Sequence, residues 1–313
     1  MVAFIARRII GTVPVMLFVA FLVFSLLFLA PGDPAAVIAG DTATPADVAR
    51  IRETLGLDQP FVFQFMNWLW RVVQGDLGTS IFAQVPVTQL ILQRLEPTLS
   101  LMVLTLIISI SVAIPLGVMA AWKAGTLLDR TIMSFAILGF SIPVFVIGYL
   151  LSYVFALELR WLPVQGYKPI AEGVGPWFRS LILPSLALGS VYIALIARVT
   201  RAAMIEVLSQ DYIRTAKAKG VKQRAILFAH SLRNAAIPVI TVIGIGVALL
   251  IGGAVVVESV FAIPGIGRLT VDAILRRDYP IIQGVVLFFS FIYVIVNLLV
   301  DLAYSVADPR IRY

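Results

Sequence analysis

The chain has 313 residues, of which 60% are hydrophobic and only 13% are charged, and its mean hydropathy is +1.00. This composition excludes an ordinary water-soluble domain and indicates an integral membrane protein. The net charge of +7 does not indicate a nucleic-acid-binding protein, because the Lys and Arg residues are spread between long apolar runs instead of lying along one soluble face.

Residue types used in metal and thiol chemistry are scarce. The sequence has no cysteine, which excludes a disulfide framework, a thiolate zinc site and an iron–sulfur cluster. Its single histidine, His230, excludes the multi-histidine motifs of zinc proteases. We therefore expect no metal site, and we interpret His230 as a solvated or interface residue, with a proton relay as the alternative.

Six charge-free stretches are long enough to span a membrane, since a helix needs about 20 apolar residues to cross about 30 Å of hydrocarbon. They are residues 9–32, 97–122, 131–157, 180–197, 234–257 and 279–300. Arg7 and Arg8 precede the first stretch as in a secretory signal, but no convincing cleavage site follows, so we interpret residues 1–32 as a cytoplasmic N-terminus and a retained helix. The sequence thus predicts an all-α integral membrane protein with six transmembrane helices.

Residues 33–96 form the one sizeable segment outside these stretches, and they are predicted to form short helices. Pro45 opens one helix, Gly56 ends it, and Pro60 starts a second. The second helix is rich in aromatic residues, namely Phe61, Phe63, Phe65, Trp68 and Trp70. We expect it to lie at the membrane interface, and a direct contact with substrate is the alternative.

The remaining residues, 97–313, are predicted to form a five-helix core with one strongly basic connection at about 198–233. Cytoplasmic loops of membrane proteins are enriched in Lys and Arg. The basic residues of this connection are Arg198, Arg201, Arg214, Lys217, Lys219, Lys222, Arg224 and Arg233. The connection is therefore predicted to be cytoplasmic, which also makes both termini cytoplasmic and places residues 33–96 on the opposite side.

Residues 211–221 within this connection predict a short helix with small residues on one side. Ala216 has no bulk to hold a partner away, and Gly220 can adopt the left-handed conformation that ends a helix. Such an element is suited to docking into a groove of another protein. The alternative is that its positive charges only fix the membrane topology.

The same segment resembles a known family. Residues 214–220 (Arg-Thr-Ala-Lys-Ala-Lys-Gly), with Arg233-Asn234 and Pro238 after them, are similar to the cytoplasmic coupling loop of permease subunits of dipeptide and oligopeptide ATP-binding-cassette importers. Similar stretches follow one another along the chain, at residues 30–34, 55–60, 75–80, 114–118, 264–268, 277–280 and 308–313. One departure is that the wider superfamily usually opens this loop with Glu-Ala-Ala, where this chain has Arg214, Thr215 and Ala216.

The resemblance implies a type I ATP-binding-cassette importer permease fold and a pore-forming subunit that is not an enzyme, in a bacterial or archaeal inner membrane. The implied partners are a second homologous permease, two ATPase subunits, an extracytoplasmic substrate-binding protein and membrane lipid, with no nucleic acid. ATP and Mg would be bound by the ATPase subunits, because the sequence has no phosphate-binding loop of the form Gly-x-x-x-x-Gly-Lys-Ser/Thr. The residues expected to couple to the ATPase are Asp211, Tyr212, Arg214, Thr215, Ala216, Lys217, Ala218 and Gly220.

Dipeptides or oligopeptides are the expected substrates, and nickel chelates, glutathione or oligosaccharides are the alternatives. A self-contained secondary transporter or channel is a different class, disfavoured because the six stretches hold no ionisable residue. Asp301, near the cytoplasmic end of the last helix, is interpreted as structural. Glu258 and Arg268, beyond the fifth stretch, could meet substrate or a binding protein or could form a salt link in the loop.

Overall fold

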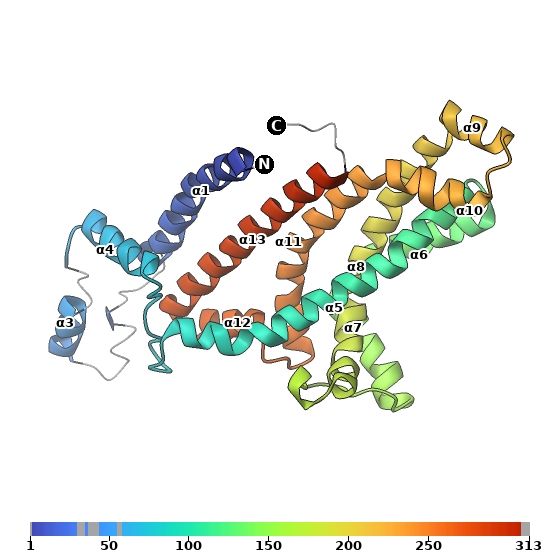
Figure 1. The fold of residues 1–313 in the computed structure, drawn as a ribbon. Coiled ribbons are helices and arrows are strands. Elements are labelled where there is room, and N and C mark those ends of the chain that lie inside the picture. The colour runs from blue at the N-terminus through green and yellow to red at the C-terminus, as the bar shows by residue number, and fades with distance from the viewer. Residues whose placement is uncertain (1, 30–34, 37–43, 55–57, 308–313) are drawn as a thin grey trace. The chain divides into compact units, whose positions relative to one another are not determined.

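The computed structural model describes residues 2–29, 35–36, 44–54 and 58–307, which form helices joined by loops (Figure 1). In chain order the α-helices are α1 (Val2–Leu29), α3 (Pro45–Thr54), α4 (Phe61–Val73), α5 (Val87–Trp122), α6 (Leu127–Ser141), α7 (Val144–Leu151), α8 (Val174–Leu208), α9 (Asp211–Ala218), α10 (Gln223–Ala225), α11 (Ala236–Val260), α12 (Ile266–Arg276) and α13 (Tyr279–Ala307). Two π-helical segments, η1 (Ser152–Glu158) and η3 (Ile226–Leu232), and one 3₁₀ turn, η2 (Ile170–Glu172), complete them. The predicted all-α fold is confirmed.

Among the described residues, α1, α5, α8, α11 and α13 are each long and apolar enough to cross a membrane. The third stretch, predicted as one helix over residues 131–157, is instead two helical pieces, residues 127–141 and 144–158, bent by 105°. The break falls at Ile142 and Pro143, both of which have extended ψ angles. Proline removes a backbone donor and disfavours the helical conformation of the residue before it, so a helix ends there. The described residues therefore contain five helices able to span a membrane, or six spans if this bent pair counts as one.

The predicted short helices outside these spans are also present. Pro45 begins α3, and Pro60 is the N-cap of α4, as the sequence indicated. Gly56, the expected end of the first of them, lies outside the described residues. The start of α5 and both ends of α8 extend past the charge-free stretches used to predict them, because a helix can continue into water once charged residues appear.

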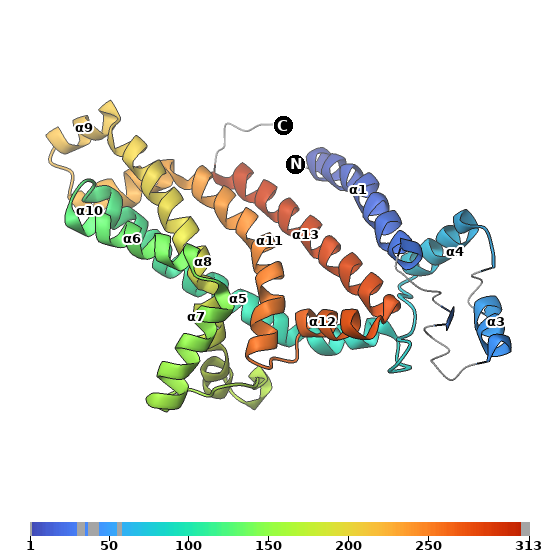
Figure 2. The same cartoon turned by 180° about the vertical axis from the view of Figure 1, so that it is seen from behind.

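The chain divides into two compact units, Met1–Leu95 with Leu269–Ile295, and Glu96–Arg268 with Val296–Tyr313. In the second unit, α8 packs beside α6, α7 and α11 (Figures 1 and 2). Gly246 on α11 leaves space for the ring of Tyr192 on α8, whose hydroxyl donates a hydrogen bond to the Ile243 carbonyl oxygen at 2.5 Å. A glycine facing a large ring allows the two backbones to approach closely, as is typical of membrane helices.

In the first unit, an aromatic cluster joins α1 to α4. Phe24 of α1 contacts Phe61, Phe65 and Trp68 of α4, with ring centroids 5.3–5.5 Å apart. The loop before α5 is fixed to the start of α13, because Ser80 Oγ donates to Asp278 Oδ2 at 2.5 Å. Both of these polar residues are buried, so the hydrogen bond replaces the water that each side chain loses.

Candidate functional site

The predicted coupling helix exists as α9, and it ends in the way that the sequence indicated. Gly220 has a φ angle of +77°. The backbone N–H of Gly220 donates to the Lys217 carbonyl at 3.0 Å, and that of Val221 donates to the Ala216 carbonyl at 3.1 Å. These two hydrogen bonds and the left-handed residue make a Schellman motif, which satisfies carbonyls at a helix end. The position of α9 after α8 is shown in Figure 1.

The residues expected to contact a partner lie together on this helix and are accessible. Seven are exposed and Ala216 is half-buried; the exposed ones are Asp211, Tyr212, Arg214, Thr215, Lys217, Ala218 and Gly220. An ion pair between Arg214 and Asp211, 3.3 Å long, is exposed to water and therefore contributes about 0–1 kcal/mol. The helix thus offers nearly its whole outer surface to a partner.

Ile213, which the sequence analysis did not select, is the buried residue of α9. Ile213 is the only residue of α9 whose side chain is completely buried. The helix α9 packs against η3. Ile213 is also the one branched aliphatic residue between positions 211 and 220. A single large aliphatic residue in a basic, small-residue helix is the sequence signal that could have identified this buried residue.

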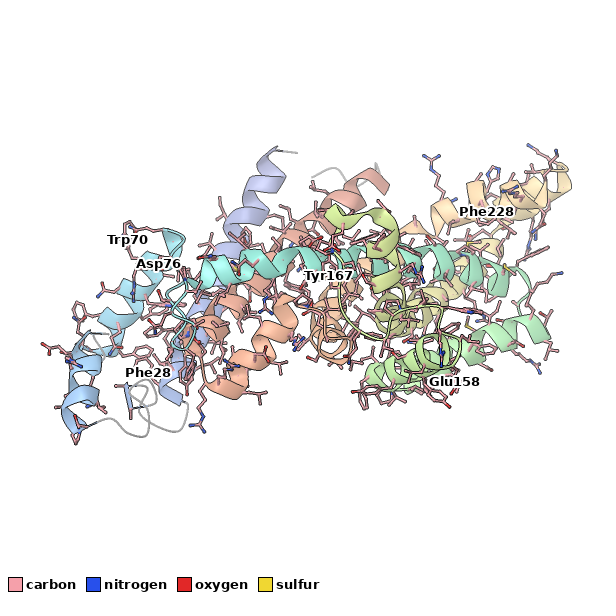
Figure 3. The ribbon with its side chains drawn as sticks, turned by 90° about the horizontal axis from the view of Figure 1, so that it is seen from below. Phe28, Trp70, Asp76, Glu158, Tyr167 and Phe228 are labelled. Atoms are coloured by element: carbon pink, nitrogen blue, oxygen red, sulfur yellow. The ribbon has the colours of Figure 1, made fainter. Side chains whose placement is uncertain are left out.

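The π-helical segment η3 links α9 to the long helices. Leu227 of η3 lies in a buried cluster with Val118 of α5 and with Ala203 and Met204 of α8. Phe228, which follows Leu227 and is labelled in Figure 3, is exposed, and so is His230. π-Helical segments are rare and often occur at functional sites. This cluster therefore joins η3 to the ends of α5 and α8.

A buried ion pair fixes α6 to the same end of α8. Arg201 of α8 donates to both carboxylate oxygens of Asp129, at 2.5 and 2.7 Å, and the backbone N–H of Gly125 donates to Asp129 Oδ2 at 2.9 Å. At the residue before Arg201, a Cβ on Gly117 of α5 would lie 2.6 Å from Thr200 Cβ, so α5 also approaches α8 closely here. Sequence reasoning missed Asp129, because its partner is 72 positions away in the chain.

Glu258 does not lie at a surface where it could meet a substrate, contrary to one of the two expectations. It is fully buried, accepts a hydrogen bond from Thr98 Oγ1 at 2.6 Å, and accepts another from the backbone N–H of Arg268 at 3.0 Å. Thr98 in turn accepts from the N–H of Ile266 at 2.8 Å. Glu258 and Thr98 therefore cap the first turn of α12, where a negative charge is favourable. Asp301 is half-buried in α13.

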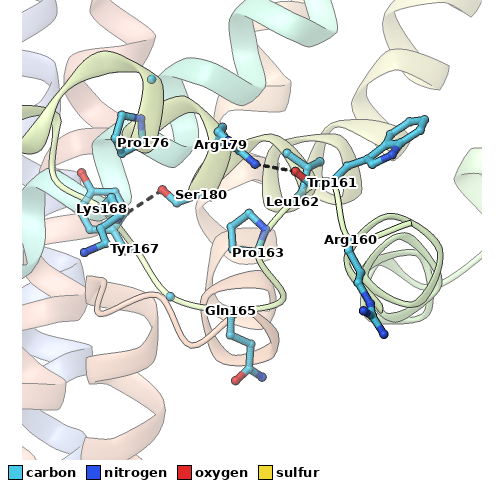
Figure 4. Close-up of a pocket in the computed structure, with 12 residues that line it drawn as sticks. Arg160, Trp161, Leu162, Pro163, Gln165, Tyr167, Lys168, Pro176, Arg179 and Ser180 are labelled. Carbon is cyan, nitrogen blue, oxygen red and sulfur yellow. Dashed lines mark hydrogen bonds between the residues drawn. The ribbon is translucent and has the colours of Figure 1, made fainter. Parts of the chain in front are cut away.

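A pocket of about 720 Å³ opens in the loop between η1 and α8, and Figure 4 shows the side chains that line it. Arg179 donates to the Trp161 carbonyl at 2.8 Å, and the exposed Lys168 pairs with Glu172. Burial, and next the hydrogen bond to Glu96, raise the pKa of Tyr167 to about 12, so its hydroxyl stays protonated at neutral pH.

No group of three His, Asp or Glu residues that could hold a metal ion is present among the described residues. The exposed polar and charged residues of α9 make it suited to docking on another protein. The exposed basic helix α9 has one buried residue and packs against η3, and packed side chains join η3 to α5 and α8.

Two family models match the chain. The model for the binding-protein-dependent transport system inner membrane component matches residues 113–313, and the model for the N-terminal part of such membrane components matches residues 1–102. Three relatives match over nearly their whole length. A protein of Sinorhizobium fredii named as a peptide ABC transporter permease is 58% identical, with 99% of each chain covered. A Brucella abortus protein named for a peptide transport system permease is 49% identical, and a glutathione transport system permease protein of Pectobacterium atrosepticum is 44% identical, each with 100% of both chains covered.

Proposed function

Since this chain belongs to the family of binding-protein-dependent transport system inner membrane components, we propose that it forms half of the pore of an ATP-driven importer of dipeptides or oligopeptides. It is a multi-pass inner-membrane permease subunit of the ATP-binding-cassette class and not itself an enzyme. The observation that supports peptides is the 58% identity, over almost the full chain, to a relative named for peptide transport.

The proposed assembly has a second homologous permease, two ATPase subunits that bind ATP and Mg, and an extracytoplasmic binding protein that delivers the substrate. Both termini and the α9–η3 connection face the cytoplasm in this proposal, since that connection has the densest cluster of Lys and Arg. Residues 33–96 then lie on the extracytoplasmic side, after a first segment of residues 1–32 and before the five-helix core of residues 97–313.

In the proposed mechanism, α9 docks on an ATPase subunit through Asp211, Tyr212, Arg214, Thr215, Ala216, Lys217, Ala218 and Gly220. Closure of the ATPases moves α9, and buried Ile213 transmits the movement to η3. The Leu227 cluster then moves the ends of α5 and α8, and the Arg201–Asp129 pair moves α6 with them. To change an equilibrium between inward-open and outward-open states from 1:99 to 99:1 takes about 5.5 kcal/mol of differential interaction.

The proposal is tested by purifying tagged chain from its native membrane in mild detergent and identifying the proteins that come with it. We expect a second six-span protein and ATPase subunits. Repeated isolation of the intact chain alone would contradict the proposal and would favour a self-contained transporter or channel.

The substrate is tested separately, by uptake into vesicles that contain the purified assembly and its binding protein. We expect labelled dipeptides or oligopeptides to accumulate only when ATP is present. Glutathione is the second candidate, because a relative that is 44% identical is named for glutathione transport. Uptake of glutathione with no uptake of other peptides would therefore change the substrate without changing the proposed class of protein.

A further inference from the structure

The helix α4 has three distinct sides. Its buried side packs on α1 and consists of Phe61, Gln64, Phe65, Trp68, Leu69 and Val72. A second side exposes five large apolar residues, Val62, Phe63, Met66, Trp70 and Val73, each 58–72% accessible. The third side exposes the polar residues Asn67, Arg71 and Gln74.

The order of these sides around the helix is regular. Successive residues are rotated by about 100° around the axis of an α-helix. Viewed along this axis, the exposed apolar residues form a stripe about 100° wide, with Val62 at one edge and Phe63 at the other. The polar residues occupy about the next 80°. The remaining arc is the side that packs on α1. Exposed apolar residues are thus gathered on one side of α4 and separated from its polar side, a pattern that marks an interaction surface and not scattered surface residues.

The level at which α4 packs on α1 indicates what covers this stripe. Phe21, Phe24 and Phe28 of α1 all contact Phe61 of α4, with ring centroids 5.0–5.9 Å apart. Phe21 precedes the end of α1 at Leu29 by about 12 Å, at 1.5 Å per residue. These phenylalanines belong to the apolar span Ile10–Phe28. The helix α4 crosses this end of α1 in both views of the ribbon (Figures 1 and 2), so it meets α1 at the depth of the hydrocarbon boundary.

We propose that α4 is an interfacial helix whose stripe Val62, Phe63, Met66, Trp70 and Val73 is embedded in lipid of the leaflet at the Leu29 end of α1. A helix with an apolar side and a polar side lies in the interface plane with its apolar side about 5–10 Å into the boundary between headgroups and acyl chains. Trp70 projects from the outside of α4 (Figure 3), and tryptophan is enriched at that level. The polar side, with Arg71, then faces water. In the orientation proposed above, this is the outer leaflet.

The absence of cysteine from the sequence allows a direct test, because each single-cysteine variant takes one spin label. Met66→Cys and Val73→Cys place the label on the stripe, and Asn67→Cys and Gln74→Cys place it on the polar side of the same helix as matched controls. The labelled assembly is reconstituted in vesicles of phosphatidylethanolamine and phosphatidylglycerol. Collision rates of the label with oxygen, which concentrates in hydrocarbon, and with a water-soluble nickel chelate are then compared.

We expect the ratio of oxygen to nickel collisions to be several-fold higher at positions 66 and 73 than at 67 and 74. High nickel accessibility at 66 and 73 would show that the stripe faces water and would overturn the proposal. Low accessibility to both reagents would show that a protein surface covers it, with the same consequence. None of these outcomes depends on the transported substrate or on ATP coupling, so the proposal can fail while the proposed function stands.

Discussion

The left-handed turn at Gly220 permits a test of the coupling mechanism in which sterics and backbone strain are separated. A Cβ added at Gly220 would meet no atom within 4 Å, so a side chain there causes no clash. A side chain at Gly220 would instead be penalised through the backbone, because the φ angle there is +77°. This conformation is unfavourable by about 1–2 kcal/mol for a residue with a Cβ and most unfavourable for a β-branched residue. Asparagine tolerates this conformation better than other non-glycine residues.

Gly220→Val should therefore disrupt the Schellman motif of α9, whereas Gly220→Asn should largely keep it. If the turn can open without disrupting any other contact, a penalty of about 1–2 kcal/mol lowers the ratio of the native turn to the opened turn by about 5- to 30-fold. We expect Gly220→Val to insert normally in the membrane and to reduce the substrate imported per ATP hydrolysed, because α9 no longer ends where its partner requires. Gly220→Asn should retain most of the coupling.

The assay is parallel measurement of substrate uptake and ATP hydrolysis in vesicles that contain equal amounts of assembled transporter. Wild-type uptake per ATP in Gly220→Val would refute the role given to this turn. Equal loss in Gly220→Asn and Gly220→Val would also refute the reasoning, since the two variants add a side chain at the same place but differ in backbone strain.

Three further changes test the packing that supports the site. Asp129→Asn should lower the unfolding midpoint by the equivalent of about 1.5–3 kcal/mol, because the partly exposed Arg201 loses its charged hydrogen-bond partner; an unchanged midpoint would contradict this. Gly246→Ala should destabilise the folded protein by about 1–3 kcal/mol, because the new methyl group would overlap the ring of Tyr192. Gly252→Ala on the same helix is the control and should be neutral or stabilising, because no atom lies within 4 Å of its added Cβ. Equal effects of the two variants on the unfolding midpoint would be inconsistent with this packing. Ile213→Ala should lower the free energy of local unfolding of α9 by about 2–5 kcal/mol. The expected result is faster amide hydrogen exchange at residues 211–218, and unaltered exchange would show that another contact holds the helix.

The all-α membrane fold could be predicted from the sequence because its cause is local. Every backbone polar group in hydrocarbon must be satisfied within the protein, so a long apolar stretch has to form a helix wherever the rest of the chain lies. The end of α9 at Gly220 is local in the same sense, since the left-handed turn and its two hydrogen bonds involve only residues 216–221. The break at Pro143 could not be read from the sequence in the same way, because Pro97 and Pro115 lie inside α5 and Pro184 lies inside α8.

The supports of the candidate site depended on tertiary structure. Asp129 and Glu258 each look like an ordinary loop or helix-end carboxylate in the sequence, and each is buried only because a partner far along the chain, Arg201 or Thr98, comes within hydrogen-bond distance. Ile213 is likewise buried, on a helix that packs against η3. Hydropathy and helix-end signals act over a few residues, so the sequence alone determined which segments become helices. Which side chains meet depends on how those helices pack, and that was decided by the tertiary structure.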